Sequence, residues 1–437
     1  MQKITHLFVG LLFICFSLNG QNAYAPISIE KIMQGERFVG FLPEGAYWSE
    51  DSKTIYFEWN PEMDTLHSLY KIAVPDGKPQ KVSLEEEGQL PGWGSYNKDR
   101  SKKVYVKNGD LFLLDIASGK TRQITNTLDG EFNPEFAADE NKISYTSSNN
   151  RFVWDVSDGS VIQLTNFNKG QERKEPKKSE MEEWLMEDQL AYFEILRQRK
   201  AVRELEKQRD EALDPQRPKA IYYGDKRISN IQSSPDLKFV TFRLTDPSKA
   251  QGTKVPNFVT ETGYLEDLNS RVKVGSQQDT YEMGVYDIER DSFYIIDTKD
   301  LEGILAKPAF LYEYHRDTVP FKDTYDKPKE VIIHGPFFSE DSKAAIVVRS
   351  MDNKDRWICL LNMATGELKQ LDWQHDEAWI GGPGIVGWNF SAGNIGWMSD
   401  NKHLYFQSEV TGFSHLYTVN VESGEKNALT NGKCELQ

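Results

Sequence analysis

Short runs of alternating apolar and polar residues recur along most of the chain. Examples are Thr54-Ile55-Tyr56-Phe57, Val104-Tyr105-Val106 and Phe239-Val240-Thr241-Phe242, which are rich in β-branched and aromatic side chains. Apolar residues at a period of two predict half-buried β-strands, and the Asp, Ser and Gly residues between the runs favour tight turns. The pattern therefore predicts an all-β protein.

A turn phrase repeats ahead of these runs. It consists of an aromatic residue or Ser, then Asp, then Lys within a few positions, and its aspartates are Asp51, Asp99, Asp139, Asp236, Asp341 and Asp400. The spacings from Asp51 to Asp99 and from Asp99 to Asp139 match the roughly 40–50 residues of a β-propeller blade. The repeat predicts a β-propeller with six to seven recognisable blades, alone or as part of a seven- or eight-bladed one. A seventh blade would lie between Lys299 and Val331. A β-sandwich, or unrelated strands joined by common turns, is the alternative.

Two longer spacings must contain insertions. Residues 170–226 predict a helical insertion, because Ser179 followed by Glu182 is a capping-box pattern. An apolar stripe at helical spacing follows, made of Met181, Leu185, Tyr192 and Leu196. Residues 245–280 predict an extended insertion, which is either a binding surface or an ordinary loop.

The N-terminus and the cysteines indicate an exported protein. Lys3 precedes an apolar run from Leu7 to Leu18, which is too short to span a bilayer and suits a secretory signal. We expect residues 1–20 to be a signal peptide cleaved after Gly20, with Ala23-Tyr24-Ala25 as a competing site, and the protein to be secreted or periplasmic. Cys359 lies in an apolar run and is expected to be a buried thiol, although a disulfide with Cys434 stays open.

Charge and motifs exclude several classes of function. The net charge of −15 argues against nucleic acid or an anionic membrane as the main partner. The chain has no Gly-x-Ser-x-Gly nucleophile elbow, the nearest sequence being Asn389-Phe390-Ser391-Ala392-Gly393, and no Walker loop, dinucleotide fingerprint or zinc helix. We therefore expect no cofactor, no metal and no catalytic residue in this chain.

One pair of carboxylates is a candidate binding site. Glu182 and Glu183 are adjacent at the start of the predicted helix. Two neighbouring anions can hold a cation such as the α-ammonium group of a peptide. A solvated helix surface also commonly carries such a pair.

The order of these features resembles a known family. The signal peptide, the repeated Asp-x-x-Lys turns, the helical insertion and the segment from Val255-Pro256 to Lys273-Val274-Gly275 occur together. The ending Gly396–Lys402 with Ser414-His415-Leu416-Tyr417 adds to the likeness. Residues 27–433 resemble the N-terminal β-propeller of dipeptidyl peptidase IV-like serine peptidases, of the prolyl oligopeptidase family, although TolB-type propellers share the single blade motifs.

The resemblance implies a role in proteolysis. In that family the propeller precedes an α/β-hydrolase domain with a Ser-Asp-His triad, and a Glu pair on an insertion binds the free N-terminus of the substrate. It assigns that pair to Glu182 and Glu183. Because the sequence stops soon after Leu429-Thr430-Asn431, we expect the hydrolase domain to be absent and the chain to be truncated.

The resulting functional prediction is a propeller that gates and selects short peptides for a serine-peptidase domain. Its expected partners are short peptides, the missing catalytic domain and, for the intact enzyme, a second copy in a homodimer. The alternatives are a non-enzymatic periplasmic TolB-like propeller that binds protein, peptide or glycan, and a non-functional remnant.

Overall fold

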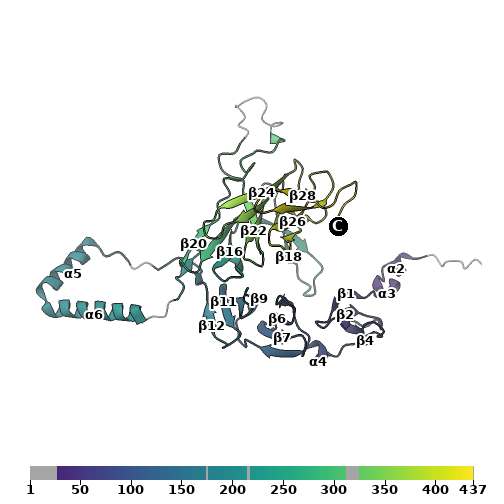
Figure 1. Ribbon diagram of the computed structural model, residues 1–437, viewed down its shortest axis with the longest axis horizontal. Coiled ribbons are helices and arrows are strands. Elements are labelled where there is room, and N and C mark those ends of the chain that lie inside the picture. Colours follow the sequence, from purple (N-terminus) through teal and green to yellow (C-terminus); the bar gives the residue numbers. More distant parts are fainter. Residues whose placement is uncertain (1–26, 174–175, 214–216, 312–323, 437) are drawn as a thin grey trace, which may run out of the picture. The chain divides into compact units, whose positions relative to one another are not determined.

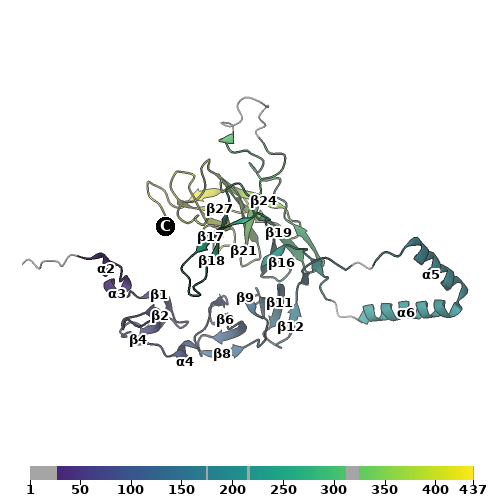
Figure 2. The same cartoon turned by 180° about the vertical axis from the view of Figure 1, so that it is seen from behind.

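The computed structural model describes residues 27–173, 176–213, 217–311 and 324–436 (Figures 1 and 2). The expected signal peptide, residues 1–20, lies outside this range. The chain divides into two compact units, one ending at Pro91 and the other beginning at Gly92. No helix in the described ranges is both long and apolar enough to cross a membrane.

The first unit contains one four-stranded antiparallel sheet and short helices. The strands are β1 (Glu44–Trp48), β2 (Thr54–Trp59), β3 (Ser68–Ala73) and β4 (Gln80–Lys81), paired in that order. The helices are α2 (Ile29–Ile32), α3 (Glu36–Val39) and α4 (Leu84–Glu87).

The second unit contains five more four-stranded antiparallel sheets, each formed in chain order. The first two are β5 (Gly94–Tyr96), β6 (Lys102–Lys107), β7 (Asp110–Asp115) and β8 (Lys120–Gln123), then β9 (Glu131–Phe136), β10 (Lys142–Ser147), β11 (Asn150–Asp155) and β12 (Val161–Gln163). The third is β15 (Arg227–Ser233), β16 (Phe239–Asp246), β19 (Thr280–Asp287) and β20 (Ser292–Ile295). The last two are β21 (Val331–Phe338), β22 (Ala344–Ser350), β23 (Asp355–Leu361) and β24 (Leu368–His375), then β25 (Ile395–Trp397), β26 (His403–Ser408), β27 (His415–Asn420) and β28 (Lys426–Ala428), with the 3₁₀ turn η1 (Trp388–Phe390) between them.

The repeated Asp phrase marks the same turn in all six sheets, as predicted. Each of the six aspartates lies between the first and second strand of its sheet. The next residue always has a positive φ, from 54° to 66°, although none is glycine: Ser52, Arg100, Glu140, Leu237, Ser342 and Asn401. At Asp236 the carboxylate accepts the Lys238 N–H at 3.2 Å and the Ser234 hydroxyl at 2.6 Å. These side-chain bonds replace backbone bonds that the turn cannot make.

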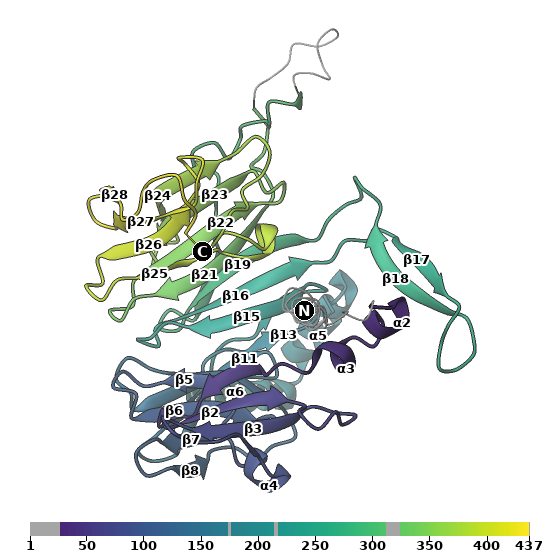
Figure 3. The same ribbon diagram turned by 90° about the vertical axis from the view of Figure 1, so that its right-hand side faces the viewer.

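Successive sheets of the second unit pack face to face through apolar clusters. One cluster joins β10 and β11 to β6 and β7, and another joins β22 and β23 to β19. A further cluster joins the other face of β22 and β23 to β26 and β27. The fold is therefore all-β and of the propeller type, with stacked four-stranded sheets (Figure 3).

Cys359 and Cys434, the cysteines of the described ranges, are both free thiols, so no disulfide joins them. Cys359 has no exposed surface and belongs to the cluster between β19 and β23, as the sequence predicted. Burial raises the pKa of its thiol to about 12, which leaves it protonated at neutral pH.

The stretch expected to hold a seventh blade has a different structure where it is described. Between Lys299 and Val331 it forms turns and an isolated bridge from Ala306 to Thr324, with residues 312–323 outside the described range. The described chain therefore has six four-stranded sheets.

The helical insertion is present as two helices, α5 (Glu180–Tyr192) and α6 (Glu194–Leu213). The predicted capping box begins α5, since the Ser179 N–H donates to Glu182 and the Glu182 N–H donates to Ser179. The predicted apolar stripe is divided, because Phe193 adopts an extended conformation and places Leu196 on the second helix. No residue of either helix, both of which are fully described, is buried.

The extended insertion is a hairpin of two strands, β17 (Gly252–Asn257) and β18 (Glu266–Val272). The hairpin is inserted between β16 and β19 of the third sheet and forms a separate two-stranded sheet (Figure 3). Its apolar side chains at the tip are exposed, among them Phe258, Val259, Tyr264 and Leu265.

Candidate ligand-binding cavity

The first strands of four consecutive sheets line a cavity of about 710 Å³. These strands are β5, β9, β15 and β21, and the cavity lies wholly within the second unit. The lining residues are Trp93, Gly94, Ser95, Val106, Phe132, Asn133, Pro134, Glu135, Asn230, Ile231, Gln232, Gly335, Pro336 and Phe337. Cavities of this volume accommodate small ligands and short peptides.

Three of the four lining strands carry a β-bulge at the cavity wall. The pairing register shifts at Asn133 in β9, at Asn230 in β15 and at Gly335 in β21. These residues have φ values of 48°, 49° and 97°, which Asn and Gly tolerate better than other residue types. A bulge leaves its extra residue out of the ladder and re-aims the backbone. The wall therefore presents main-chain groups as well as side chains.

Glu135 is the one titratable residue among those that line the cavity. Its Oε2 atom lies 2.8 Å from Nη2 of Arg151, whose side chain has no exposed surface, while 39% of the Glu135 side chain is exposed. Arg151 also donates to the bulge carbonyl of Asn133 at 2.9 Å and to the hydroxyls of Ser144 and Ser233. Burial raises the pKa of Glu135, and the nearby Arg151 opposes that shift. The ion pair thus fixes both a carboxylate and a bulge at the cavity wall.

Aromatic side chains provide the apolar part of the wall. Trp93 is 96% exposed and Phe132 is 57% exposed, so both offer free ring faces. Together with the polar side chains of Ser95 and Gln232, they form a lining that suits a ligand with both apolar and hydrogen-bonding groups.

The sequence interpretation missed this cavity. Its residues come from four sheets, and only the packing of these sheets brings them together. The available signal was a charged residue inside an alternating strand, which occurs at Glu135 and again at Arg151. Charged side chains are rarely buried unless they are paired, but Glu135 and Arg151 lie on β9 and β11 with β10 between them, so this signal alone did not join the two residues.

The predicted carboxylate pair lies elsewhere. Glu182 and Glu183 are in the first turn of α5, and neither lines the cavity. The Oε2 atom of Glu182 accepts hydrogen bonds from the Ser179 N–H at 2.8 Å and the Ser179 hydroxyl at 3.0 Å. Both hydrogen bonds lower the pKa of Glu182, and the one from the Ser179 backbone N–H has the larger effect. Glu182 therefore has a structural role at the helix start in addition to its negative charge.

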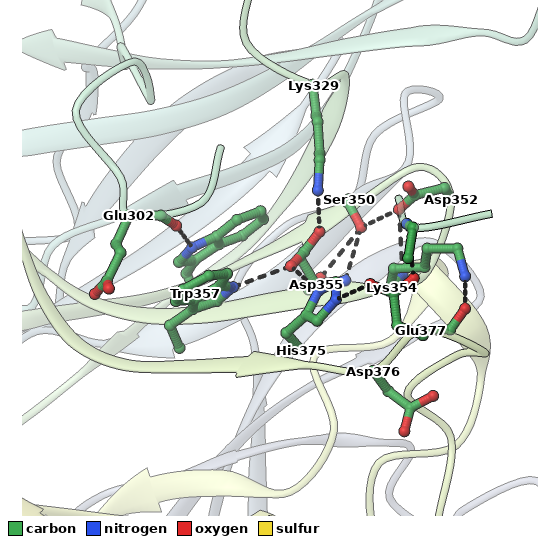
Figure 4. Close-up of polar contacts among 12 residues, drawn as sticks. Glu302, Lys329, Ser350, Asp352, Lys354, Asp355, Trp357, His375, Asp376 and Glu377 are labelled. Atoms are coloured by element: carbon green, nitrogen blue, oxygen red, sulfur yellow. Dashed lines mark hydrogen bonds and ion pairs between the residues drawn. The ribbon is translucent and has the colours of Figure 1, made fainter. Parts of the chain in front are cut away.

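A second polar cluster surrounds the buried carboxylate of Asp355 (Figure 4). Lys329 forms an ion pair with it, the indole N–H of Trp373 donates to Oδ1 at 3.0 Å, and Nδ1 of His375 lies 2.7 Å from the same oxygen. The other ring nitrogen of His375 faces Glu377 at 3.3 Å. The three groups around Asp355 join the segment before β21 to β23 and β24.

This cluster contains Ser, His and Asp side chains but lacks the geometry of a catalytic triad. The Ser350 hydroxyl donates to Asp352 at 2.5 Å and accepts the Asp355 N–H at 2.9 Å, so it is not directed at His375. Ser350 also has no exposed surface, whereas a nucleophile must reach its substrate and contact its base. The arrangement is consistent with a structural role.

Possible metal ligands are dispersed. Among residues in the described ranges, no group of three or more His, Cys, Asp or Glu side chains is close enough to hold a metal ion. His403, one of the two neighbouring histidines in the sequence, contacts Asp400 at 2.6 Å, while His415 contacts the Gly432 carbonyl at 3.1 Å.

Comparison with known protein families agrees with the motifs. Residues 227–437 match the family described as the dipeptidyl peptidase IV (DPP IV) N-terminal region. This part of the chain is thus a DPP IV-like N-terminal domain, as its motifs predicted. A search of curated protein sequences found no match.

The solved structures that match this chain include two bacterial peptidases. Dipeptidyl peptidase 4 of Porphyromonas gingivalis is 12% identical with a TM-score of 0.48, and the alignment covers 94% of this chain and 50% of that one. A putative dipeptidyl aminopeptidase IV of Bacteroides ovatus is 13% identical with a TM-score of 0.44, covering 90% and 48%. An oligogalacturonate lyase solved with manganese is 10% identical with a TM-score of 0.40, covering 88% and 76%. The chain spans about half the length of the two peptidases.

Proposed function

We propose that this chain is the substrate-selecting propeller of a secreted serine peptidase that acts on short peptides. The observation that carries the proposal is the cavity, where bulged strands, exposed aromatic rings and one paired carboxylate face the same space. Bulged backbone can hydrogen-bond an extended peptide, and Trp93 and Phe132 can contact its apolar side chains.

The catalytic part of the proposed enzyme is a hydrolase domain outside this chain. A cavity in the propeller would hold one part of the peptide while that domain cleaves another. Glu182 and Glu183 are proposed to bind the free α-ammonium group, which would fix how many residues precede the cut. Secretion and a homodimeric assembly belong to the same proposal.

Peptide binding tests the cavity directly. Isothermal titration of this chain with unblocked dipeptides and tetrapeptides is expected to show binding, and Trp93→Ala is expected to weaken it by about tenfold, the loss of one aromatic contact. The matched control is Trp388→Ala, because Trp388 is also exposed, at 58%, but does not line the cavity. Equal effects of the two variants would contradict the proposal. Binding of a folded protein without any peptide binding would favour the non-enzymatic propeller instead.

The enzymatic setting has its own test. Source cells are labelled with a fluorophosphonate probe and blotted with antibody to this propeller. A labelled band well above the 50.2 kDa of this chain is expected for a complete serine peptidase. An unlabelled band near that mass would contradict the peptidase assignment and leave a binding propeller or a remnant.

A further inference from the structure

Two buried arginines face each other across neighbouring strands of the fourth sheet in the second unit. Arg349 is the last but one residue of β22, Arg356 is the second residue of β23, and the two are direct register partners. Neither has any exposed surface. Side chains of directly paired residues lie on the same face of a sheet, and like charges in this position repel each other. The structure therefore holds two positive charges together in its interior.

Uncharged oxygen atoms accept all the hydrogen bonds of these arginines. Arg349 donates to the carbonyls of Ile380, Ile385 and Ser391 and to the side chain of Asn353. Within the described ranges, neither guanidinium group forms an ion pair with a carboxylate. Arg151 provides the contrast, since its buried guanidinium is paired with Glu135.

The hydrogen-bond acceptors of Arg356 are uncharged as well. It donates to the carbonyls of Ala392 and Gln407 and to the side chain of Gln374. Asp372, whose charge also acts on Arg356, is bound by Lys426 at 2.6 Å. Burial and, for Arg356, the neighbouring arginine lower the pKa values to about 10 for Arg349 and about 9 for Arg356, so both stay charged at neutral pH.

Each arginine also has a buried donor that no described residue accepts. These donors are Nε of Arg349 and Nη2 of Arg356. Both guanidinium groups contact the same glycine-rich loop, Arg349 through Ser391 and Arg356 through Ala392. A Cβ atom added at Gly393 would lie 3.2 Å from Nη2 of Arg356, so the loop backbone passes close to that donor. A buried donor without an acceptor is costly, and an uncompensated buried charge is more so.

We propose that Arg349 and Arg356 bind a small inorganic anion of the halide class, chloride in physiological media, beneath the loop of residues 380–394. A monatomic anion would accept from both free donors and compensate part of the double positive charge. The anion would hold the loop against β22 and β23, and with it the exposed ring of Trp388, which contacts the exposed ring of Trp379. The inference is independent of the peptide-binding function.

Thermal unfolding at constant ionic strength tests the proposal. Replacing gluconate with chloride is expected to raise the unfolding midpoint of this chain in a saturable way, and bromide is expected to substitute for chloride. Arg356→Gln is expected to weaken the halide affinity by about tenfold to a hundredfold, the effect of losing a charged hydrogen-bond donor. The matched control is Arg227→Gln, because Arg227 is an exposed arginine paired with Asp279 and should keep the full response.

The unmodified chain gives a second readout if the variant does not fold. Crystals grown in bromide are expected to show an anomalous peak within hydrogen-bond distance of Nε of Arg349 and Nη2 of Arg356. A midpoint that is the same in chloride and gluconate, together with no bromide peak at this position, would overturn the proposal.

Discussion

The Nδ1 atom of His375 lies 2.7 Å from Oδ1 of Asp355, a carboxylate with no exposed side-chain surface. Two other donors, Lys329 and Trp373, bind the same carboxylate. A buried charge held by three partners is stabilising only while all of them remain, because removing one leaves part of the charge uncompensated. The protonation of His375 is therefore coupled to the stability of this region.

For His375, we expect greater stability in mild acid. Burial acts to lower its pKa, but hydrogen bonds to Asp355 and Glu377 raise it above 6.5 overall. A raised pKa in the folded state contributes stability below the unfolded value of about 6.5 and loses it as the pH rises through the folded value. His375→Gln should therefore cost up to about 1 kcal/mol more below pH 6.5 than in alkaline solution. Urea unfolding of both proteins across this range checks the sign, and a cost independent of pH would contradict it.

For His334 we expect the opposite pH dependence, with lower stability in acid. Burial, together with the charges of Arg243, Arg349 and Arg356, lowers its pKa to about 4, against a hydrogen bond to the Asn389 carbonyl that raises it. Stability is present above the unfolded value of about 6.5 and is lost as the pH falls towards 4. Between those pH values the free energy of unfolding of the unchanged protein should fall by an amount on the order of 2 kcal/mol, and His334→Gln should abolish this fall. The same urea experiment at several pH values distinguishes the two histidines.

The turn geometry makes a prediction at Ser52. This exposed residue has a φ of 57°, where a side chain is strained and glycine is not. We expect Ser52→Gly to raise the free energy of unfolding by about 0.5–1 kcal/mol and Ser52→Val to lower it by about 1–2 kcal/mol. Urea unfolding of each variant and of the unchanged protein measures these differences in the free energy of unfolding. A stabilising Val would show that the turn does not keep this conformation.

Two roles of Glu182 can be separated by substitution. Gln at this position retains the capping box and removes the charge, whereas Ser179→Ala removes the cap and should cost about 1 kcal/mol of helix stability. If the Glu pair binds an α-ammonium group, Glu182→Gln should weaken binding of unblocked peptides several-fold while N-acetylated peptides are unaffected. Circular dichroism monitors the helix and calorimetry monitors binding. Unchanged affinity for unblocked peptides would remove Glu182 from the proposed site.

The tip of the β17–β18 hairpin makes a prediction about assembly. Phe258 and Tyr264 are more than three-quarters exposed, and adjoining apolar residues extend this surface. Exposed apolar clusters of this kind are typical of contact surfaces. We expect the double variant Phe258→Lys, Tyr264→Lys to weaken self-association by at least about tenfold in light scattering. Leu128→Lys, at an exposed position on another loop, is the control and should leave the mass unchanged.

Local signals in the sequence predicted much of the fold. The aspartates of the repeat occupy equivalent turns because Asp bonds to backbone within two residues, an interaction independent of distant contacts. The capping box at Ser179 was predictable for the same reason. The apolar stripe was wrong beyond Tyr192, because the extended conformation of Phe193 interrupts the helix and the periodicity does not reveal it.

The cavity and the arginine pair could not be predicted in this way. Glu135 meets Arg151, and Arg349 meets Arg356, only after strand register is set. The register of β9 depends on the bulge at Asn133, which shifts the pairing of the residues that follow it. No bulge interrupts the pairing of β22 with β23, so the hairpin between these two strands sets the register that brings Arg349 to Arg356. Sequence reasoning identified the strands but not the register between them, and therefore missed both pairs.

The base of the helical insertion has a consequence for engineering. Parallel pairing of β13 (Phe167–Asn168) with β14 (Ile221–Tyr222), and the two hydrogen bonds between Gly170 and Gly224, hold its ends side by side. Because the free energy of closing a loop changes slowly with its length, the segment between these ends is a modular unit. A reporter domain whose termini lie close together can replace it at this junction, with the flanking sheets left in register.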